Sequence, residues 1–219
     1  NVSFALNPGE VLGLLGTTGS GKSTIARLIA RIYDPTSGEV TIDGVSPRDV
    51  TLAQLHRRLG MVTQDVQVFS ASVRENVRVF DPTVADADIM TAIAAVGLES
   101  WFRNLPDGLD TRLRPAESLS AGQAQLLAFT RVFLQDPGLI VMDEPSSRLD
   151  PVTEAQIEFA VDQLLKPAHR GVGRTAVIIA HKLKTLERAD RVLVLEHGRI
   201  VESGPRQTLA TTPDSRLAR

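Results

Sequence analysis

Hydrophobic residues in this chain form runs of two kinds, which predict strands and helices in alternation. Continuous apolar runs at residues 11–15, 139–142 and 175–179 predict buried strands of a parallel sheet. Helical patterns of hydrophobic positions follow at residues 23–33 and 120–134. This alternation predicts an α/β domain in which helices cover a mostly parallel sheet.

Shorter patterns predict the remaining elements. Alternating residues predict half-buried strands, and an Asp-Gly or His-Gly pair between two apolar stretches predicts a hairpin turn. The expected elements are a strand at 2–6, a hairpin at 39–45, a helix at 52–58, a strand at 60–63, a hairpin at 192–201 and a helical tail at 206–219.

Strands disappear from the pattern between residue 72 and about residue 116, where helices dominate. This segment predicts a helical insertion in the α/β domain. We therefore expect a single domain over residues 1–219, with its α/β core at 1–71 and 135–219 and a helical subdomain at 72–134.

The stretch that follows the first apolar run is rich in glycine. A strand, a glycine loop and then a helix is the context that the phosphate-binding P-loop motif requires. Glycine permits positive φ, so that consecutive N–H groups can surround phosphate oxygens. We expect Lys22 to reach the β- and γ-phosphates of a nucleotide and the Ser23 hydroxyl to bind Mg²⁺. The expected phosphate-binding residues are Gly16, Thr17, Thr18, Gly19, Ser20, Gly21, Lys22, Ser23 and Thr24.

Two carboxylates, Asp143 and Glu144, close the apolar run at residues 139–142. In P-loop proteins a carboxylate at this point holds Mg²⁺ or its water shell, and we assign that role to Asp143. Glu144 is placed to polarise a water molecule against the γ-phosphate. Carboxylates at a strand end can also be ordinary solvated charge, but the glycine loop upstream favours the functional interpretation.

Composition narrows the class of protein. The net charge of −2 produces no global basic field, so we expect no nucleic-acid partner. The absence of cysteine excludes disulfides and thiol chemistry. No apolar run approaches the roughly 20 residues that span a bilayer. The chain begins at Asn1 in what reads as the middle of a strand, so we expect a piece of a longer polypeptide.

Several further motifs, ordered along the chain, resemble those of ATP-binding cassette (ABC) proteins. The segment Leu119-Ser120-Ala121-Gly122-Gln123 resembles the LSGGQ signature of that family. Gln64 lies where the family has its Q-loop, residues 147–150 resemble its D-loop, and His181 occupies the place of its switch histidine. The resemblance covers nearly all of the chain.

The resemblance implies a P-loop NTPase fold with a RecA-like parallel sheet core, an antiparallel β subdomain and a helical signature subdomain. It implies an ATPase that uses ATP and Mg²⁺ and works as a two-fold dimer. In such a dimer, Ser120, Ala121, Gly122 and Gln123 of one subunit cover the ATP bound to the other. Lys22, Glu144 and His181 would be catalytic, and Ser23, Gln64 and Asp143 would bind the metal. Asp150 would cross the dimer interface.

The segment from Gln64 and Asp65 through Phe69 to residues 72–77 resembles ABC exporters whose membrane and ATPase parts are fused. This implies two partners, a second nucleotide-binding domain and a transmembrane domain upstream of residue 1 in the same polypeptide. It also implies a location at the cytoplasmic face of a cell membrane. Three alternatives stay open: a soluble ABC ATPase, an importer subunit, and a low-turnover half of a heterodimer.

The chain departs from the family pattern at a few positions. Ala121 replaces a signature glycine, and we expect the change to be mild because we expect no positive φ there. Ala124 and Leu126 replace residues that are often basic in the family. The aromatic residue that stacks on adenine would lie upstream of residue 1, so we assign no adenine platform.

Overall fold

The computed structural model describes residues 2–114, 119–146, 149–166, 173–180 and 183–217. The chain divides into two compact units, and each unit combines stretches that are distant in the sequence. The first unit comprises Asn1–Met61, Pro137–Glu144 and Pro167–Arg219, and the second comprises Val62–Asp136 and Pro145–Lys166.

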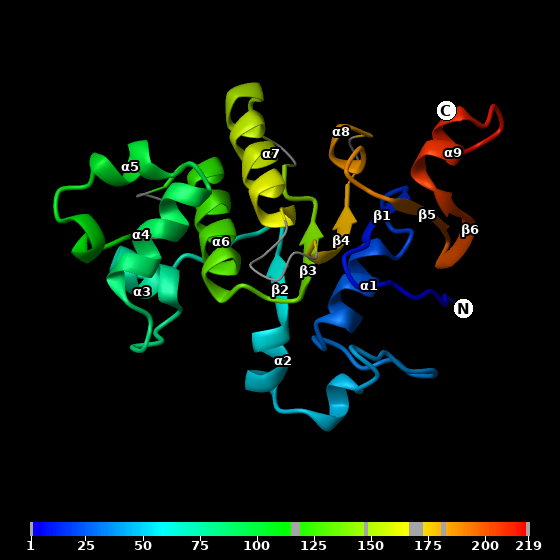
Figure 1. Cartoon of the computed structure of the whole chain (residues 1–219), viewed down its shortest axis with the longest axis horizontal. Helices are drawn as coiled ribbons and strands as arrows, with labels where there is room; N and C mark the ends of the chain where they lie inside the picture. The colour runs from blue at the N-terminus through cyan, green and yellow to red at the C-terminus, as the bar shows by residue number, and fades with distance from the viewer. Residues whose placement is uncertain (1, 115–118, 147–148, 167–172, 181–182, 218–219) are drawn as a thin grey trace. The chain divides into compact units, whose positions relative to one another are not determined.

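The first unit is organised around a sheet that, within the described residues, has six strands in the order β2-β3-β4-β1-β5-β6 (Figure 1). Strand β4 pairs in parallel with both β3 and β1, β1 pairs in parallel with β5, and β6 pairs with β5 in the antiparallel sense. The α/β class with a mostly parallel sheet is therefore confirmed. The strands are β1 Val11–Gly16, β2 Leu59–Val62, β3 Leu139–Asp143, β4 Thr175–Ile179, β5 Arg191–Glu196 and β6 Arg199–Pro205.

The core of the first unit lies between this sheet and two helices. Helix α1 (Lys22–Ile29) contributes Ile25 and Ala26, and helix α2 (Leu52–Arg58) contributes Leu55. These side chains pack with Leu12 and Val141 of the central strands, which are fully buried. The unit also contains η1 Pro47–Asp49, α8 Leu183–Leu186 and α9 Arg206–Thr211.

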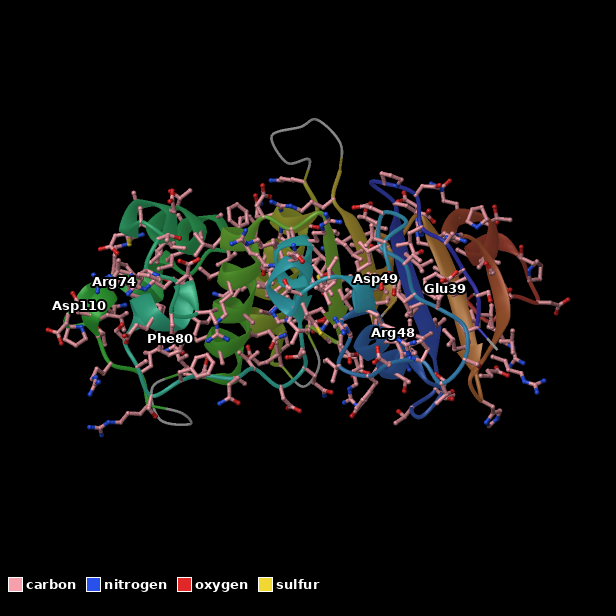
Figure 2. The ribbon with its side chains drawn as sticks, turned by 90° about the horizontal axis from the view of Figure 1, so that it is seen from below. Glu39, Arg48, Asp49, Arg74, Phe80 and Asp110 are labelled. Atoms are coloured by element: carbon pink, nitrogen blue, oxygen red, sulfur yellow. The ribbon has the colours of Figure 1, made fainter. Side chains whose placement is uncertain are left out.

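The second unit is helical, and α6 is its central element. Helices α3, α4 and α7 all contact α6, whose Phe129 side chain is completely buried. The Arg74 guanidinium of α3 donates hydrogen bonds to the carboxylates of Asp86 and Asp110, which joins three segments of the unit. Arg74 and Asp110 are labelled in Figure 2. The helices are α3 Val73–Arg78, α4 Asp86–Ala95, α5 Glu99–Arg103, η2 Gly108–Asp110, α6 Ala121–Gln135 and α7 Pro151–Leu165.

Local sequence explains where four of these helices begin. Thr51, Ser72 and Ser120 each form a capping box with a Gln or Glu three residues later, so the first N–H groups of α2, α3 and α6 are satisfied. Asp150 caps α7, and Pro151 occupies its first position.

Four expected elements differ from the structure. The helix expected at residues 23–33 is shorter, since α1 ends at Ile29. Residues 2–6 form no strand, because they pair with no other strand of the described chain, although Val2, Phe4 and Leu6 pack against the core. At residues 39–45 the Asp43-Gly44 turn forms, but its pairing stops at the single bridge between Ile42 and Val45. The tail helix α9 is shorter than expected because it ends at Thr211, before Pro213.

The domain boundaries inferred from the sequence stay a prediction. The expected helical subdomain at 72–134 lies inside the second unit, which also includes residues 62–71 and 145–166. None of the helices in the described part of the chain combines the length and the apolar character needed to cross a bilayer.

Candidate active site

The glycine loop takes the backbone conformation that its sequence predicts. It connects the end of β1 at Gly16 with the start of α1 at Lys22, and Gly16, Gly19 and Gly21 all have positive φ. A Cβ atom at Gly16 would overlap the Leu195 carbonyl and the Ser20 hydroxyl. Only glycine therefore lets the chain turn so tightly under the end of β5.

Lys22 is the first residue after this loop, and it is only 4% exposed. Its Nζ donates hydrogen bonds to the carbonyl oxygens of Gly16, at 2.7 Å, and Thr17, at 3.0 Å. Burial lowers the pKa of Lys22, and the attraction of Glu144 and Asp143 opposes this effect only in part. The loop thus presents a buried positive charge, which suits an anion.

Ser23 and Asp143 meet although 120 residues separate them in the sequence. The Ser23 hydroxyl donates a hydrogen bond to Asp143 Oδ1 at 3.2 Å. Burial is the largest influence on Asp143 and raises its pKa, with the nearby Glu144 acting in the same direction. A hydroxyl beside a carboxylate is a hard oxygen donor set, which fits Mg²⁺.

The described residues contain no cluster of three or more His, Cys, Asp or Glu side chains that could hold a metal by themselves. A magnesium ion at Ser23 and Asp143 would therefore take further oxygen ligands from phosphate and water, as Mg²⁺ usually does.

Glu144 has a backbone conformation that the sequence did not reveal. Its φ is +51°, in the left-handed region that non-glycine residues seldom adopt. The Glu144 N–H donates a hydrogen bond to the Ile179 carbonyl at the end of β4, at 2.9 Å. Such a conformation persists only where the surroundings stabilise it, and it is typical of functional positions.

A turn distant in the sequence supports the glycine loop. The N–H of Gly198, in the β5–β6 turn, donates a hydrogen bond to the Ser20 carbonyl at 3.0 Å. Ser20 is only 2% exposed, and its hydroxyl makes no hydrogen bond to any of the described residues. The His197-Gly198 pair predicts a turn, but no sequence signal indicates which loop that turn contacts.

The signature segment lies in the second unit, at the start of α6. Ser120 is exposed, its hydroxyl accepts the Gln123 N–H at 3.2 Å, and the Gln123 side chain accepts the Ser120 N–H at 2.9 Å. Ala121 is the first helical residue and has no positive φ, so its replacement of glycine is mild. Gly122 is buried against α7, where an added Cβ atom would overlap the Thr153 side chain.

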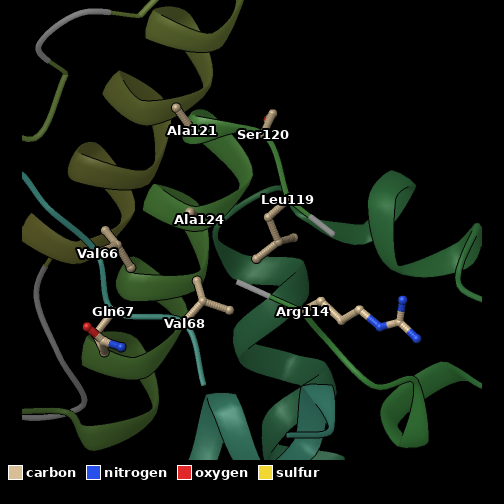
Figure 3. Close-up of a pocket in the computed structure, with 8 residues that line it drawn as sticks. All are labelled: Val66, Gln67, Val68, Arg114, Leu119, Ser120, Ala121 and Ala124. Carbon is tan, nitrogen blue, oxygen red and sulfur yellow. The ribbon is translucent and has the colours of Figure 1, made fainter. Parts of the chain in front are cut away.

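A shallow cavity of about 260 Å³ opens beside Ser120 and Ala121 (Figure 3). Residues 66–68 form one wall and α6 forms another. The small side chain of Ala124 also lines the cavity, at a position where the family often has a basic residue.

The structure does not test every site residue inferred from the sequence. Gln64 comes two residues after the end of β2 and belongs to the second unit. Its role at the metal stays a prediction. His181, Ser147 and Arg148 lie outside the described residues. Asp150 caps α7 by accepting the N–H groups of residues 152 and 153, and its role in a dimer is likewise untested.

Comparison with known proteins agrees with this geometry. The sequence model of the family described as ABC transporter matches residues 1–147. The ABC transporter ATP-binding protein YknV of Bacillus subtilis is 44% identical over 204 residues, 93% of this chain and 33% of that protein. The lipid A-core flippase of Burkholderia thailandensis is 40% identical over 210 residues, 95% of this chain and 34% of that protein.

A solved structure gives the same result. The ATP-bound structure of a bacterial Atm1-family ABC exporter superposes with a TM-score of 0.86 and 32% identity, over 99% of this chain and 37% of that one. The chain thus spans about a third of the length of the relatives that it matches.

Proposed function

Because this chain belongs to the ABC transporter family, we propose that it is the ATP-hydrolysing motor domain of an exporter, working with Mg²⁺. The observation that carries the proposal is the hydrogen bond between Ser23 and Asp143. It brings two of the three expected metal ligands together at a glycine loop next to the buried Lys22 and to Glu144.

The chemistry assigns a role to each group. The loop N–H groups, the amino end of α1 and Lys22 would bind the phosphates and offset the charge that develops on the γ-phosphate. Ser23, Asp143 and Gln64 would hold the metal, which supplies electrostatic stabilisation when bound. Glu144 would accept a proton from the attacking water, or orient that water, with His181 completing the site.

The signature residues would act on a second nucleotide. Ser120 is exposed at the amino end of α6, a helix of 15 residues, where N–H groups and the helix dipole favour an anion. We propose that Ser120, Ala121, Gly122 and Gln123 of one subunit cover the ATP held by another. A two-fold axis would form this contact twice.

The names of the relatives support an exporter rather than an importer or a soluble ATPase. They include the lipid A-core flippase and the β-(1→2)glucan export ATP-binding/permease protein of Rhodopseudomonas palustris, which is 40% identical over 205 residues. We propose a membrane domain as partner, received near Gln64 and the helical unit, and a location at the cytoplasmic face of the membrane.

Replacement of Glu144 by Gln tests the proposal in the intact protein. The variant should bind ATP normally, hydrolyse it at least about 100-fold more slowly, and accumulate as an ATP-bound dimer. Phosphate release and size-exclusion chromatography with ATP measure these effects. Hydrolysis at the wild-type rate would remove Glu144 from the catalytic role.

A further inference from the structure

We propose that Gln125 is a positioning residue for Gln64, and that it ties this expected metal ligand to the signature helix. The inference rests on the proposed ATPase function. It concerns a side chain that contacts neither nucleotide nor metal in that proposal, so its effect would be indirect.

The contact itself is well placed for this role. Gln125 lies in the second turn of α6, is 5% exposed, and donates a hydrogen bond from Nε2 to the Thr63 carbonyl at 3.1 Å. That carbonyl belongs to the peptide unit that joins Thr63 to Gln64. Because a peptide unit is planar, the bond restricts the direction in which the chain enters Gln64.

Strand β2 ends at Val62, so the sheet no longer restrains the chain at this point. The Gln125 amide, 62 residues away in the sequence, restrains the chain here instead. It does so together with the Thr63 hydroxyl, which donates a local hydrogen bond to the Asp65 carbonyl at 2.8 Å. Its neighbours Ala124 and Leu126 carry no side-chain donor that could compete for the same carbonyl.

The same helix restrains the segment again a few residues later. Arg131 donates hydrogen bonds to the carbonyl oxygens of Gln67 and Asn76, each at 2.8 Å, and its guanidinium lies 5.6 Å from the centre of the Phe69 ring. The Asn76 side chain in turn bonds both the N–H and the carbonyl of Phe69. Figure 3 shows Val66, Gln67 and Val68 beside α6.

Ala121 lies one turn before Gln125 on α6. A displacement of the signature end of this helix would therefore move the peptide before Gln64. By this route, engagement of a nucleotide by the signature residues of one subunit would alter the metal ligand of that same subunit.

The test replaces Gln125 with Met, which keeps the length of the side chain but removes the donor. In the intact protein, the Mg²⁺ concentration for half-maximal ATP hydrolysis should rise about tenfold, as for the loss of a group that orients a metal ligand. The ATP concentration for half-maximal binding should stay unchanged. The matched control is Thr130→Val, which removes a buried side-chain hydrogen bond, to the Leu126 carbonyl, within α6 itself.

A second comparison separates positioning from general stability. In a Gln64→Ala background, Gln125→Met should have no further effect on the Mg²⁺ requirement, because the group that it positions is gone. If Gln125→Met does not fold, Gln125→Asn, which is too short for the contact, should give the same shift. An unchanged Mg²⁺ requirement, or an equal shift in the Gln64→Ala background, would overturn the inference. A wild-type protein without Mg²⁺-dependent ATP hydrolysis would instead refute the proposed function, and this inference with it.

Discussion

The phosphate loop and the signature segment are both proposed as anion sites at helix starts, but they are built differently. In the loop, the positive charge of Lys22 is buried and bonded to carbonyl groups of its own chain, and three glycines have positive φ. At the signature, Ser120 is exposed and ordinary helical geometry suffices, because a capping box satisfies the helix end. The loop is thus complete within one chain, whereas the signature presents a surface that a second chain would use.

The largest expected effect concerns Lys22, because it carries the charge of the complete site. Lys22→Ala should weaken ATP binding about 10- to 150-fold, the equivalent of a charge-assisted hydrogen bond worth about 1.5–3 kcal/mol. Calorimetric titration with ATP, in a Glu144→Gln background that prevents turnover, measures the change. Lys184→Ala removes an exposed lysine of the same unit and should change nothing. An unaltered dissociation constant for Lys22→Ala would contradict the phosphate contact.

Asp143 gives a second test of the site at the phosphate loop, because burial makes its negative charge unfavourable in the folded protein. Asp143→Asn should raise the Mg²⁺ concentration for half-maximal ATP hydrolysis at least about tenfold. It should also raise the Tm of the nucleotide-free protein at neutral pH. Burial raises the pKa of Asp143 above the ordinary 3.8, so stability is lost as pH rises through the folded-state pKa. The gain in Tm should therefore disappear below pH 3.8. A lower Tm at pH 7 would show that the carboxylate stabilises the fold.

Ser120 and Ser72 form a matched pair, since both cap a helix of the second unit with the same box. Replacement of either by Ala should cost about 1 kcal/mol of unfolding free energy, measured by urea denaturation. Only Ser120→Ala should also reduce ATP hydrolysis, by about tenfold, through a lost hydrogen bond to phosphate. Equal activity of the two variants would mean that the signature cap is structural alone.

The sequence predicted those parts of the site that depend on neighbouring residues. The glycine loop and the two carboxylates at the end of β3 are local patterns, and the structure has the loop as expected. The caps at Ser120 and Asp150 are local patterns of the same kind. The meeting of Ser23 with Asp143 was also predictable, because the parallel strands β1 and β3 end at the same edge of the sheet, although β4 lies between them.

What could not be predicted depends on contacts between distant residues. The left-handed backbone of Glu144 is stabilised by the Ile179 carbonyl, and the Gly198 N–H bonds the glycine loop. Neither contact leaves a pattern in the local sequence. The strand expected at residues 2–6 does not form, for a related reason. Alternation of hydrophobic and polar residues indicates a strand, but it does not show which other strand could pair with it.

The smallest expected effect tests an ion pair at the start of β1, away from both anion sites. Glu10 accepts hydrogen bonds from Arg191 Nε at 2.7 Å and from the Asn7 N–H at 2.8 Å. Burial alone would raise the pKa of Glu10, but these hydrogen bonds and the positive charge of Arg191 outweigh it, and the pKa lies below the ordinary 4.5.

Glu10→Gln should therefore lower the unfolding free energy at pH 7 by about 1 kcal/mol, since the pair is partly exposed. Because the folded-state pKa is depressed, the stability is present above pH 4.5 and is lost as pH falls through the folded-state value. The two proteins should thus converge in urea denaturation below pH 4.5, with ATP affinity the same in both. Glu39→Gln, at an exposed carboxylate (Figure 2), serves as the control and should have no effect at either pH. A change in ATP affinity for Glu10→Gln would mean that the strand start and the glycine loop are coupled, and that the loop is less self-contained than its own contacts indicate.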